Sequence, residues 1–122
     1  MATGRWDPDD VTAAGVRHVL LSYERLDAGD VQGYTSQYDV NAVVRAPGRV
    51  PALGRGAVAQ GAADRVARPG CPDLHVVHHV VAAPQRIMVV GRMVGRVGTE
   101  FADVFTVSDR GLLLSQTTFY FR

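Results

Sequence analysis

Lysine is absent from this chain of 122 residues, and each of the 13 basic residues is an arginine, set against 12 acidic residues. The formal net charge is +1, so there is no excess of positive charge of the kind that binds nucleic acid or an anionic membrane surface. No apolar run is long enough to cross a bilayer, and residues 1–7 lack the apolar core of a signal peptide. We therefore expect a cytoplasmic protein without nucleic-acid or membrane partners.

Cysteine is nearly absent as well. Cys71 is the single cysteine, so no disulfide can form within the chain. It stands between Gly70 and Pro72, which indicates a loop, and the sequence shows no partner that would activate its thiol. With 47% apolar and 20% charged residues in a chain of this length, we expect one globular domain over residues 1–122.

Helix signals dominate the first half of the chain. A cap at Asp7, a proline at the first helical position and a stop at Gly29 predict a helix over about residues 8–27. A short helix is expected over 30–37, and an alanine-rich helix over 54–67. Between them lie a strand over 39–46 and a short edge strand near 50–53.

The last third of the chain has strand patterns over residues 73–82, 86–97, 99–107 and 112–121. Short turns join them, so we expect antiparallel neighbours. Helices followed by an antiparallel meander predict an α+β fold with the helices on one sheet face. A curved antiparallel sheet, mixed at its edge and wrapped over three N-terminal helices, makes a cone whose open end suits a small-molecule cavity.

The strand over 99–107 carries an acidic residue on an apolar face. Alternation places Phe101, Asp103 and Phe105 on the same side of this strand. A carboxylate between two phenylalanines is either a working acid or base, or a structural group paired with Arg92, Arg96 or a histidine of the cavity. Both interpretations remain open from the pattern alone.

Three histidines, His75, His78 and His79, fall in the strand over 73–82. Alternation places His75 and His79 on one face, roughly 13 Å apart, with His78 on the other. That separation is too large for a shared metal ion, so no metal site is expected. His75 is a candidate acid or base, and the alternative is a histidine satisfied by a backbone carbonyl.

Other polar residues could line the same cavity. His18 and Ser22 lie one turn apart on the first helix and could hydrogen-bond a ligand carbonyl, or make an ordinary contact between helices. Gln116, Thr118 and Tyr120 share one face of the last strand and suggest an oxygenated ligand, although a solvated sheet face would look the same.

The opposite face of the last strand carries Thr117, Phe119 and Phe121. If this face is external, its aromatic residues form an exposed apolar patch, and such patches mark subunit interfaces. We therefore expect a homodimer formed through the outer sheet face. A slip of one residue in register would exchange the two faces.

Four segments in this order and spacing carry a family resemblance: residues 26–30 (LDAGD), 38–44 (YDVNAVV), 54–56 (GRG) and 103–111 (DVFTVSDRG). They resemble the nuclear-transport-factor-2-like superfamily, specifically its SnoaL-like and ketosteroid-isomerase-like branch. The resemblance covers nearly the whole chain and implies catalytic groups inside the cone. It also implies that Leu26, Ala46, Met93, Phe101 and Phe105 line the substrate cavity.

Residue by residue, the isomerase pattern is incomplete. Asp103 matches the isomerases' protonated aspartic acid, which helps to hold an oxyanion. Their tyrosine on the first helix falls on Ser22, and their general-base aspartate falls on Ala46. The resemblance therefore does not imply an isomerase of the ketosteroid type.

A second branch, resembling scytalone dehydratase, matches at His75 and at Asp27, but its second active-site histidine has no match. SnoaL-type cyclases pair an aspartate with a histidine, which Asp103 and His75 could supply. The resemblance thus implies a cofactor-free acid/base enzyme of secondary metabolism, such as antibiotic biosynthesis, that cyclises, dehydrates or isomerises a polyketide-like intermediate. In this scheme Asp103 and His75 exchange the proton, and Ser22 or Tyr120 holds the enolate oxygen.

Two other functions remain open. The chain could be a non-catalytic module that binds or carries a small molecule, as many proteins of this fold are. It could also be an epoxide hydrolase, which would need an Asp-Arg-Asp set in the cavity, and Asp103 with Arg92 would supply part of that set.

Overall fold

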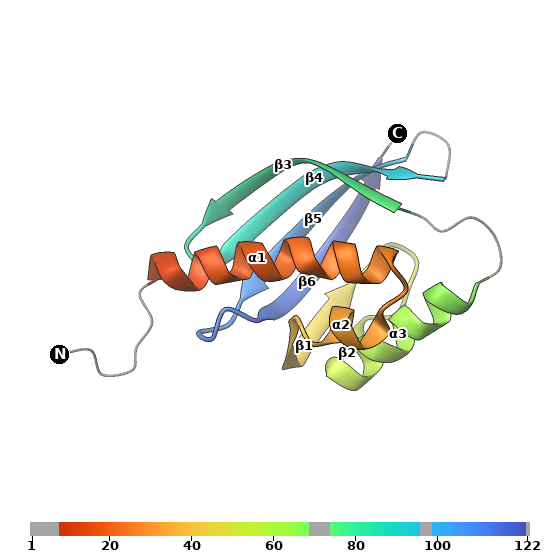
Figure 1. Cartoon of the computed structure of the whole chain (residues 1–122), viewed down its shortest axis with the longest axis horizontal. Helices are drawn as coiled ribbons and strands as arrows, with labels where there is room; N and C mark the ends of the chain where they lie inside the picture. Colours follow the sequence, from red (N-terminus) through yellow and green to blue (C-terminus); the bar gives the residue numbers. More distant parts are fainter. Residues whose placement is uncertain (1–7, 69–73, 96–98, 122) are drawn as a thin grey trace.

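The computed structural model describes residues 8–68, 74–95 and 99–121, which form three helices and one curved sheet (Figure 1). The helices are α1 (Pro8–Asp27), α2 (Val31–Thr35) and α3 (Arg55–Ala67). The strands are β1 (Tyr38–Arg45), β2 (Ala52–Leu53), β3 (Leu74–Ala83), β4 (Arg86–Val94), β5 (Glu100–Val107) and β6 (Leu113–Phe121). The predicted α+β class is confirmed. The expected cap at Asp7, the loop at Cys71, the turn at Gly98 and Arg96 lie outside the described residues.

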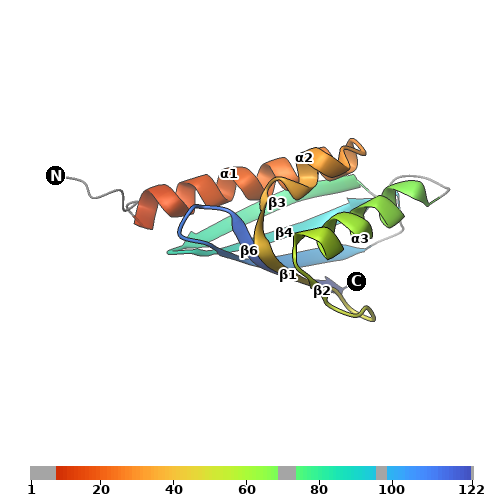
Figure 2. The same cartoon turned by 90° about the horizontal axis from the view of Figure 1, so that it is seen from below.

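The six strands pair in the order β2-β1-β6-β5-β4-β3. Strands β3 to β6 are antiparallel neighbours, as predicted, because each follows the last through a short turn. Strand β1 lies parallel to β6, which makes the sheet mixed at this edge. Figures 1 and 2 show that the helices lie on one side of this curved sheet, with α1 extended along β3 and β4. The other side of the sheet carries no helix among the described elements.

Helix α1 is held on the sheet by a stripe of apolar residues. Val11, Val19 and Tyr23 are buried against the inward side chains Ile87 and Phe105. The spacing of the three helical residues follows the helical period, so they share one face. This packing sets the depth of α1 over the sheet and leaves its C-terminal turns beside β3.

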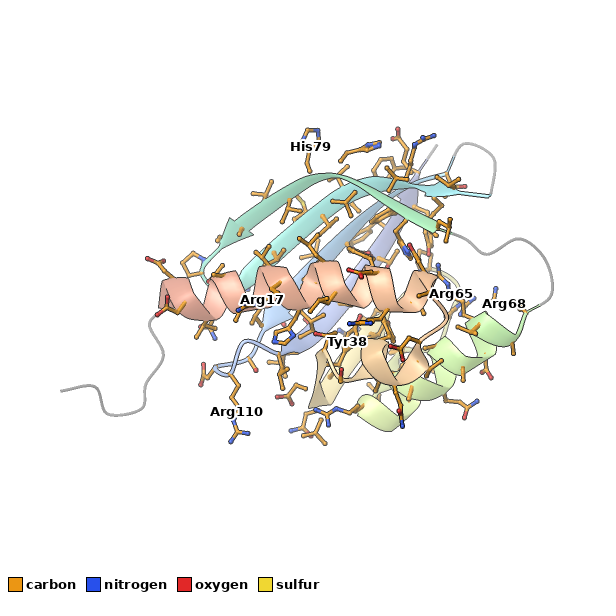
Figure 3. The ribbon with its side chains drawn as sticks, viewed as in Figure 1. Arg17, Tyr38, Arg65, Arg68, His79 and Arg110 are labelled. Atoms are coloured by element: carbon orange, nitrogen blue, oxygen red, sulfur yellow. The ribbon has the colours of Figure 1, made fainter. Side chains whose placement is uncertain are left out.

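A bulge in β3 reverses the alternation of its side chains. Val77 pairs with Gly91, but His79 pairs with the next residue, Val90, so that His78 has no partner in β4. Before the bulge His75 lies on the concave face of the sheet, and after it His79 lies on the outer face, where it points away from the helices (Figure 3). The prediction that His75 and His79 share a face is therefore wrong.

Gly91 lies opposite this bulge, where the two strands approach closely. A Cβ atom at Gly91 would stand 2.1 Å from the carbonyl oxygen of Val76 and 2.9 Å from the ring of Phe101. The backbone of β3 and the buried ring cannot both move far enough to make room for this Cβ atom. Glycine at this position is thus required by the close approach of β3 and β4.

We predict that Gly91→Ala lowers the free energy of unfolding by about 1–3 kcal/mol, the usual cost of overpacking. Gly56→Ala is the matched control, because nothing lies within 4 Å of the added Cβ and the position is helical. The control should raise the stability by up to about 1 kcal/mol. Urea unfolding followed by circular dichroism measures both, and an unchanged stability of Gly91→Ala would contradict the close approach.

Candidate functional site

A cavity of about 570 Å³ opens between the concave face of the sheet, the C-terminal half of α1 and one side of α3. Helices α1, α2 and α3 and strands β1, β3, β4, β5 and β6 all contribute lining residues, and the polar and aromatic wall comes mainly from α1, β3, β5 and β6. Exposed residues such as Val50 and Arg68 also line it, so the cavity opens to solvent at their end. The cavity is large enough for a small organic molecule.

Asp103 is the most deeply buried acidic group of this wall, with 2% of its surface exposed. The Tyr23 hydroxyl donates to Asp103 Oδ2 at 2.6 Å, and the Thr118 hydroxyl donates to Oδ1. Thr118 is the cross-strand partner of Asp103, so the pairing of β5 and β6 places that donor directly opposite. A buried carboxylate is costly unless it is hydrogen-bonded, and here each oxygen receives a bond.

Tyr23 lies between α1 and the sheet, and its ring also lines the cavity. Burial, followed by the charge of Asp103, raises the pKa of Tyr23 well above its ordinary value. Tyr23 therefore keeps its proton throughout the physiological range and remains a donor. Its one proton is engaged in the hydrogen bond to Asp103 Oδ2.

His75 is held by Asp27, the last residue of α1. Its Nδ1 lies 2.7 Å from Asp27 Oδ1, and its backbone nitrogen donates to Asp27 Oδ2 at 2.8 Å. Because a carboxylate can only accept, Nδ1 carries the proton of the neutral ring and Nε2 is left as the acceptor. Asp27 thus fixes both the position and the tautomer of the imidazole.

The two centres are adjacent on the same wall. The rings of Tyr23 and His75 have centroids 4.7 Å apart, and Phe101 packs edge-on against His75 at 5.3 Å. His75, Tyr23, Asp103 and Thr118 therefore follow one another along the cavity, and Asp27 holds His75 from behind this row. A single small molecule can contact both the imidazole and the Tyr23–Asp103 pair.

A second buried hydrogen bond closes the inner end of the cavity. The Tyr38 hydroxyl donates to Gln116 Oε1, and the Tyr34 ring packs against Tyr38 with centroids 5.0 Å apart. Burial raises the pKa of both phenols above the ordinary value. These side chains are a neutral, hydrogen-bonded part of the lining.

The structure places ten of the twelve residues expected at the site around this cavity: Ser22, Leu26, Ala46, His75, Met93, Phe101, Asp103, Gln116, Thr118 and Tyr120. Ser22 has its own proton engaged, because its hydroxyl donates to the Val19 carbonyl oxygen at 2.6 Å. It can accept a hydrogen bond from a ligand but cannot donate to an enolate oxygen without losing that bond.

Two expected residues lie elsewhere. The ring of His18 meets Gln37 Oε1 at 2.5 Å and so links α1 to the segment after α2. Phe105 is fully buried and packs edge-on against Tyr23, behind the cavity wall. The alternative of an ion pair between Asp103 and Arg92 is also wrong. Arg92 lies opposite Glu100 in the register of β4 and β5, on the outer face of the sheet.

Tyr23 was not among the residues expected at the site, and the sequence analysis missed its contact with Asp103. A tyrosine in an apolar helix stripe needs a partner for its hydroxyl, and Asp103 is the acid that alternation points inward from the sheet. That combination was the available signal. The arginines Arg49, Arg65 and Arg68 also line the cavity and had no such signal in the sequence.

Within residues 8–68, 74–95 and 99–121, no group of three or more His, Cys, Asp or Glu side chains is arranged to hold a metal ion. None of the described helices is both long and apolar enough to span a membrane.

The buried phenols predict sensitivity to alkali. A phenol ionises near pH 10 in the unfolded chain but at higher pH in the native protein, so the native state binds more protons above pH 10 and stability falls as pH rises. Tyr23, Tyr34 and Tyr38 should each contribute a loss of up to about 1.4 kcal/mol per pH unit.

Urea unfolding between pH 9 and pH 11.5 measures this slope, and Tyr38→Phe should lessen it by about one tyrosine's share. An identical slope in the variant would show that Tyr38 ionises equally in both states.

No family model matches the chain, and no curated protein sequence matches it. Solved structures do. An epoxide hydrolase of Mycobacterium tuberculosis described as LEH-like shares 15% identity at a TM-score of 0.76, over 90% of this chain and 84% of that one. SalBIII is an epoxide hydrolase/cyclase-like enzyme with a role in pyran ring formation in the polyether salinomycin. It shares 18% identity at a TM-score of 0.71, over 88% of this chain and 90% of that one.

An NTF2-like protein of unknown function from Cytophaga hutchinsonii shares 11% identity at a TM-score of 0.68, over 98% of this chain and 95% of that one. All three align over most of both chains with little sequence identity, so the likeness is one of fold. It agrees with the strand order, the three helices and the cavity described above. The chain has the nuclear-transport-factor-2-like fold.

Proposed function

We propose that this protein is a cofactor-independent acid/base enzyme whose active site is the wall formed by His75, Tyr23 and Asp103. The observation that carries the proposal is the fixed imidazole. Asp27 holds Nδ1 of His75 so that Nε2 is the free acceptor, beside a Tyr23 hydroxyl that is held by a buried carboxylate. A positioned base next to a positioned donor is the arrangement that proton transfer at carbon requires.

The proposed reaction begins at a carbon next to a carbonyl group of the substrate. Nε2 of His75 takes the proton, the electron pair of the C–H bond becomes the enolate, and the Tyr23 hydroxyl turns from Asp103 Oδ2 to donate its hydrogen bond to the enolate oxygen. The imidazolium of His75 then returns the proton to another carbon, to a departing hydroxyl or to a new alkoxide. These outcomes are isomerisation, dehydration and aldol cyclisation, and none requires an outside electron donor or acceptor.

A substrate with an apolar body and several oxygens suits the lining. Leu26, Met93 and Phe101 supply apolar surface, while Gln116 and Thr118 supply hydrogen-bonding groups. A polyketide-like intermediate has this character, and ring formation by SalBIII on the same fold is a related chemistry. Epoxide hydrolysis by an Asp-Arg-Asp set is less well supported, because Arg92 lies on the outer face.

We further propose that the outer sheet face forms a homodimer. Val81, Met88 and Phe119 are 54%, 40% and 51% exposed on this face, and cross-strand pairing joins Val81 to Met88 and Ala102 to Phe119. The cavity opens on the other side of the sheet, so a second copy could cover this patch without closing the site.

The enzyme is tested by proton exchange, which needs no knowledge of the natural substrate. In D₂O, the protein should accelerate exchange of the hydrogens next to the carbonyl of small ketones, with 1-tetralone and 2-tetralone as first probes, followed by NMR. Asp103→Asn and His75→Gln should each reduce the rate at least tenfold, because His75 takes the proton and Asp103 positions the Tyr23 hydroxyl.

His79→Gln is the matched control, since it changes a histidine of the same strand on the outer face. Circular dichroism confirms that each variant is folded. Equal exchange rates in the wild type and in both site variants would rule out catalysis by this wall. Tight binding of the ketones without exchange would instead favour a binding or carrier function.

For the dimer, sedimentation velocity should show a dimer for the wild type and a monomer for Phe119→Glu, because a buried charge opposes association. Leu20→Glu, at an exposed apolar residue of α1, should remain dimeric. A dimer that persists in Phe119→Glu would place the interface elsewhere.

A further inference from the structure

Three arginines line the cavity. Arg65 and Arg68 come from the C-terminal end of α3, and Arg49 comes from the turn after β1. Figure 3 shows Arg65 and Arg68 at the end of the molecule where α1 and α3 terminate, whereas Arg17 and Arg110 lie toward the other end. The proton-transfer chemistry proposed above makes no use of these guanidinium groups.

The arginines of α3 continue the face of that helix that lines the cavity. Val58, Ala62 and Arg65 follow the helical period, and Arg68 at the C-cap extends the row by three residues. Cations are favourable at a helix C-terminus, so the dipole of α3 accounts for part of this placement. It does not account for Arg49, whose turn is closed by a bond from its backbone nitrogen to the Ala46 carbonyl oxygen at 3.3 Å.

Arg65 acts on the interior of the cavity. Its positive charge lowers the pKa of Tyr34 against the larger opposing effect of burial, and both side chains line the cavity. Arg65 is half-buried, while Arg49 and Arg68 are exposed. The three cations therefore extend from the cavity's interior to its opening.

The charge of the lining differs from that of the whole chain. The chain has 13 basic and 12 acidic residues, but the described residues that line the cavity include three arginines and one acid, Asp103. Asp103 is at the buried wall with its oxygens bonded to Tyr23 and Thr118. Within the described part of the chain, neither Arg49 nor Arg68 forms an ion pair with a carboxylate.

We infer that the ligand of this cavity carries an anionic group, a carboxylate in the simplest case, that binds at Arg49, Arg65 and Arg68 while its apolar body reaches toward His75 and Asp103. Guanidinium groups match the geometry of a carboxylate and bind it with two hydrogen bonds. The negative charge of Asp103 repels the anion from the buried wall, so the ligand enters in one orientation. This inference rests on the proposed function, for which it defines the substrate class.

The test compares two probes of the same shape and different charge, 1-naphthylacetate and its methyl ester. Fluorescence titration at low ionic strength should give at least tenfold tighter binding of the acid, and added salt should reduce that preference. The double variant Arg65→Gln/Arg68→Gln should bind both probes equally. Arg17→Gln/Arg110→Gln changes the net charge by the same amount away from the cavity and should keep the preference.

Equal binding of acid and ester by the wild type overturns the inference, as does failure of both probes to bind at millimolar concentration. An equal loss of preference in both double variants also overturns it, because net charge alone would then explain the effect. Ketone exchange is measured separately, so a protein that exchanges ketones without preferring the acid retains the proposed function. A protein that prefers the acid but does not exchange the ketone hydrogens retains the anion site, as a binding site alone.

Discussion

The carboxylate of Asp103 is the group on which the arrangement of the cavity depends. It lies on β5 and receives hydrogen bonds from α1 through Tyr23 and from β6 through Thr118. A charge buried to this degree requires both donors, because removal of either would leave an oxygen without a partner in an apolar surrounding. The bond to Tyr23 joins two elements 80 residues apart in sequence, so it fixes α1 over the sheet at the depth that the cavity needs.

From this bond the polar wall extends in two directions. The tilted packing of Tyr23 on His75 connects it to Asp27, and the pairing of β5 with β6 connects it to Thr118. Each residue of the wall is held by a neighbour that belongs to another element. This mutual support means that the acceptor nitrogen of His75 and the buried carboxylate keep a constant relation, which acid/base chemistry at a single substrate requires.

Much of this fold could be predicted from sequence because its signals are local. Pro8 and Gly29 bracket α1, and short turns make β3 to β6 antiparallel neighbours. Alternation was sufficient to place Asp103 inward because β5 is regular from Glu100 to Thr106. It failed at His79 because a bulge depends on the partner strand, where Gly91 admits the backbone of β3, and nothing within β3 itself reveals it.

The site was harder to predict where it depends on distances between elements. Tyr23 fits an apolar stripe, and its role follows from where α1 rests on the sheet. Arg49 lies in a turn, and Arg65 lies near the end of a helix 16 residues later in the chain. Periodicity cannot show that the turn and the helix end reach the same cavity. Local patterns therefore gave the elements, and only their packing gave the complete lining.

The bulge in β3 has a consequence for how such a site can arise or disappear. His75 faces inward and His79 outward because one extra residue, His78, separates two otherwise regular stretches of strand. If β3 kept His78 but paired without the bulge, one of its two stretches would shift by one residue and turn its side chains to the opposite face of the sheet. The pocket imidazole can thus be gained or lost with the bulge, with no amino-acid replacement at the histidine itself.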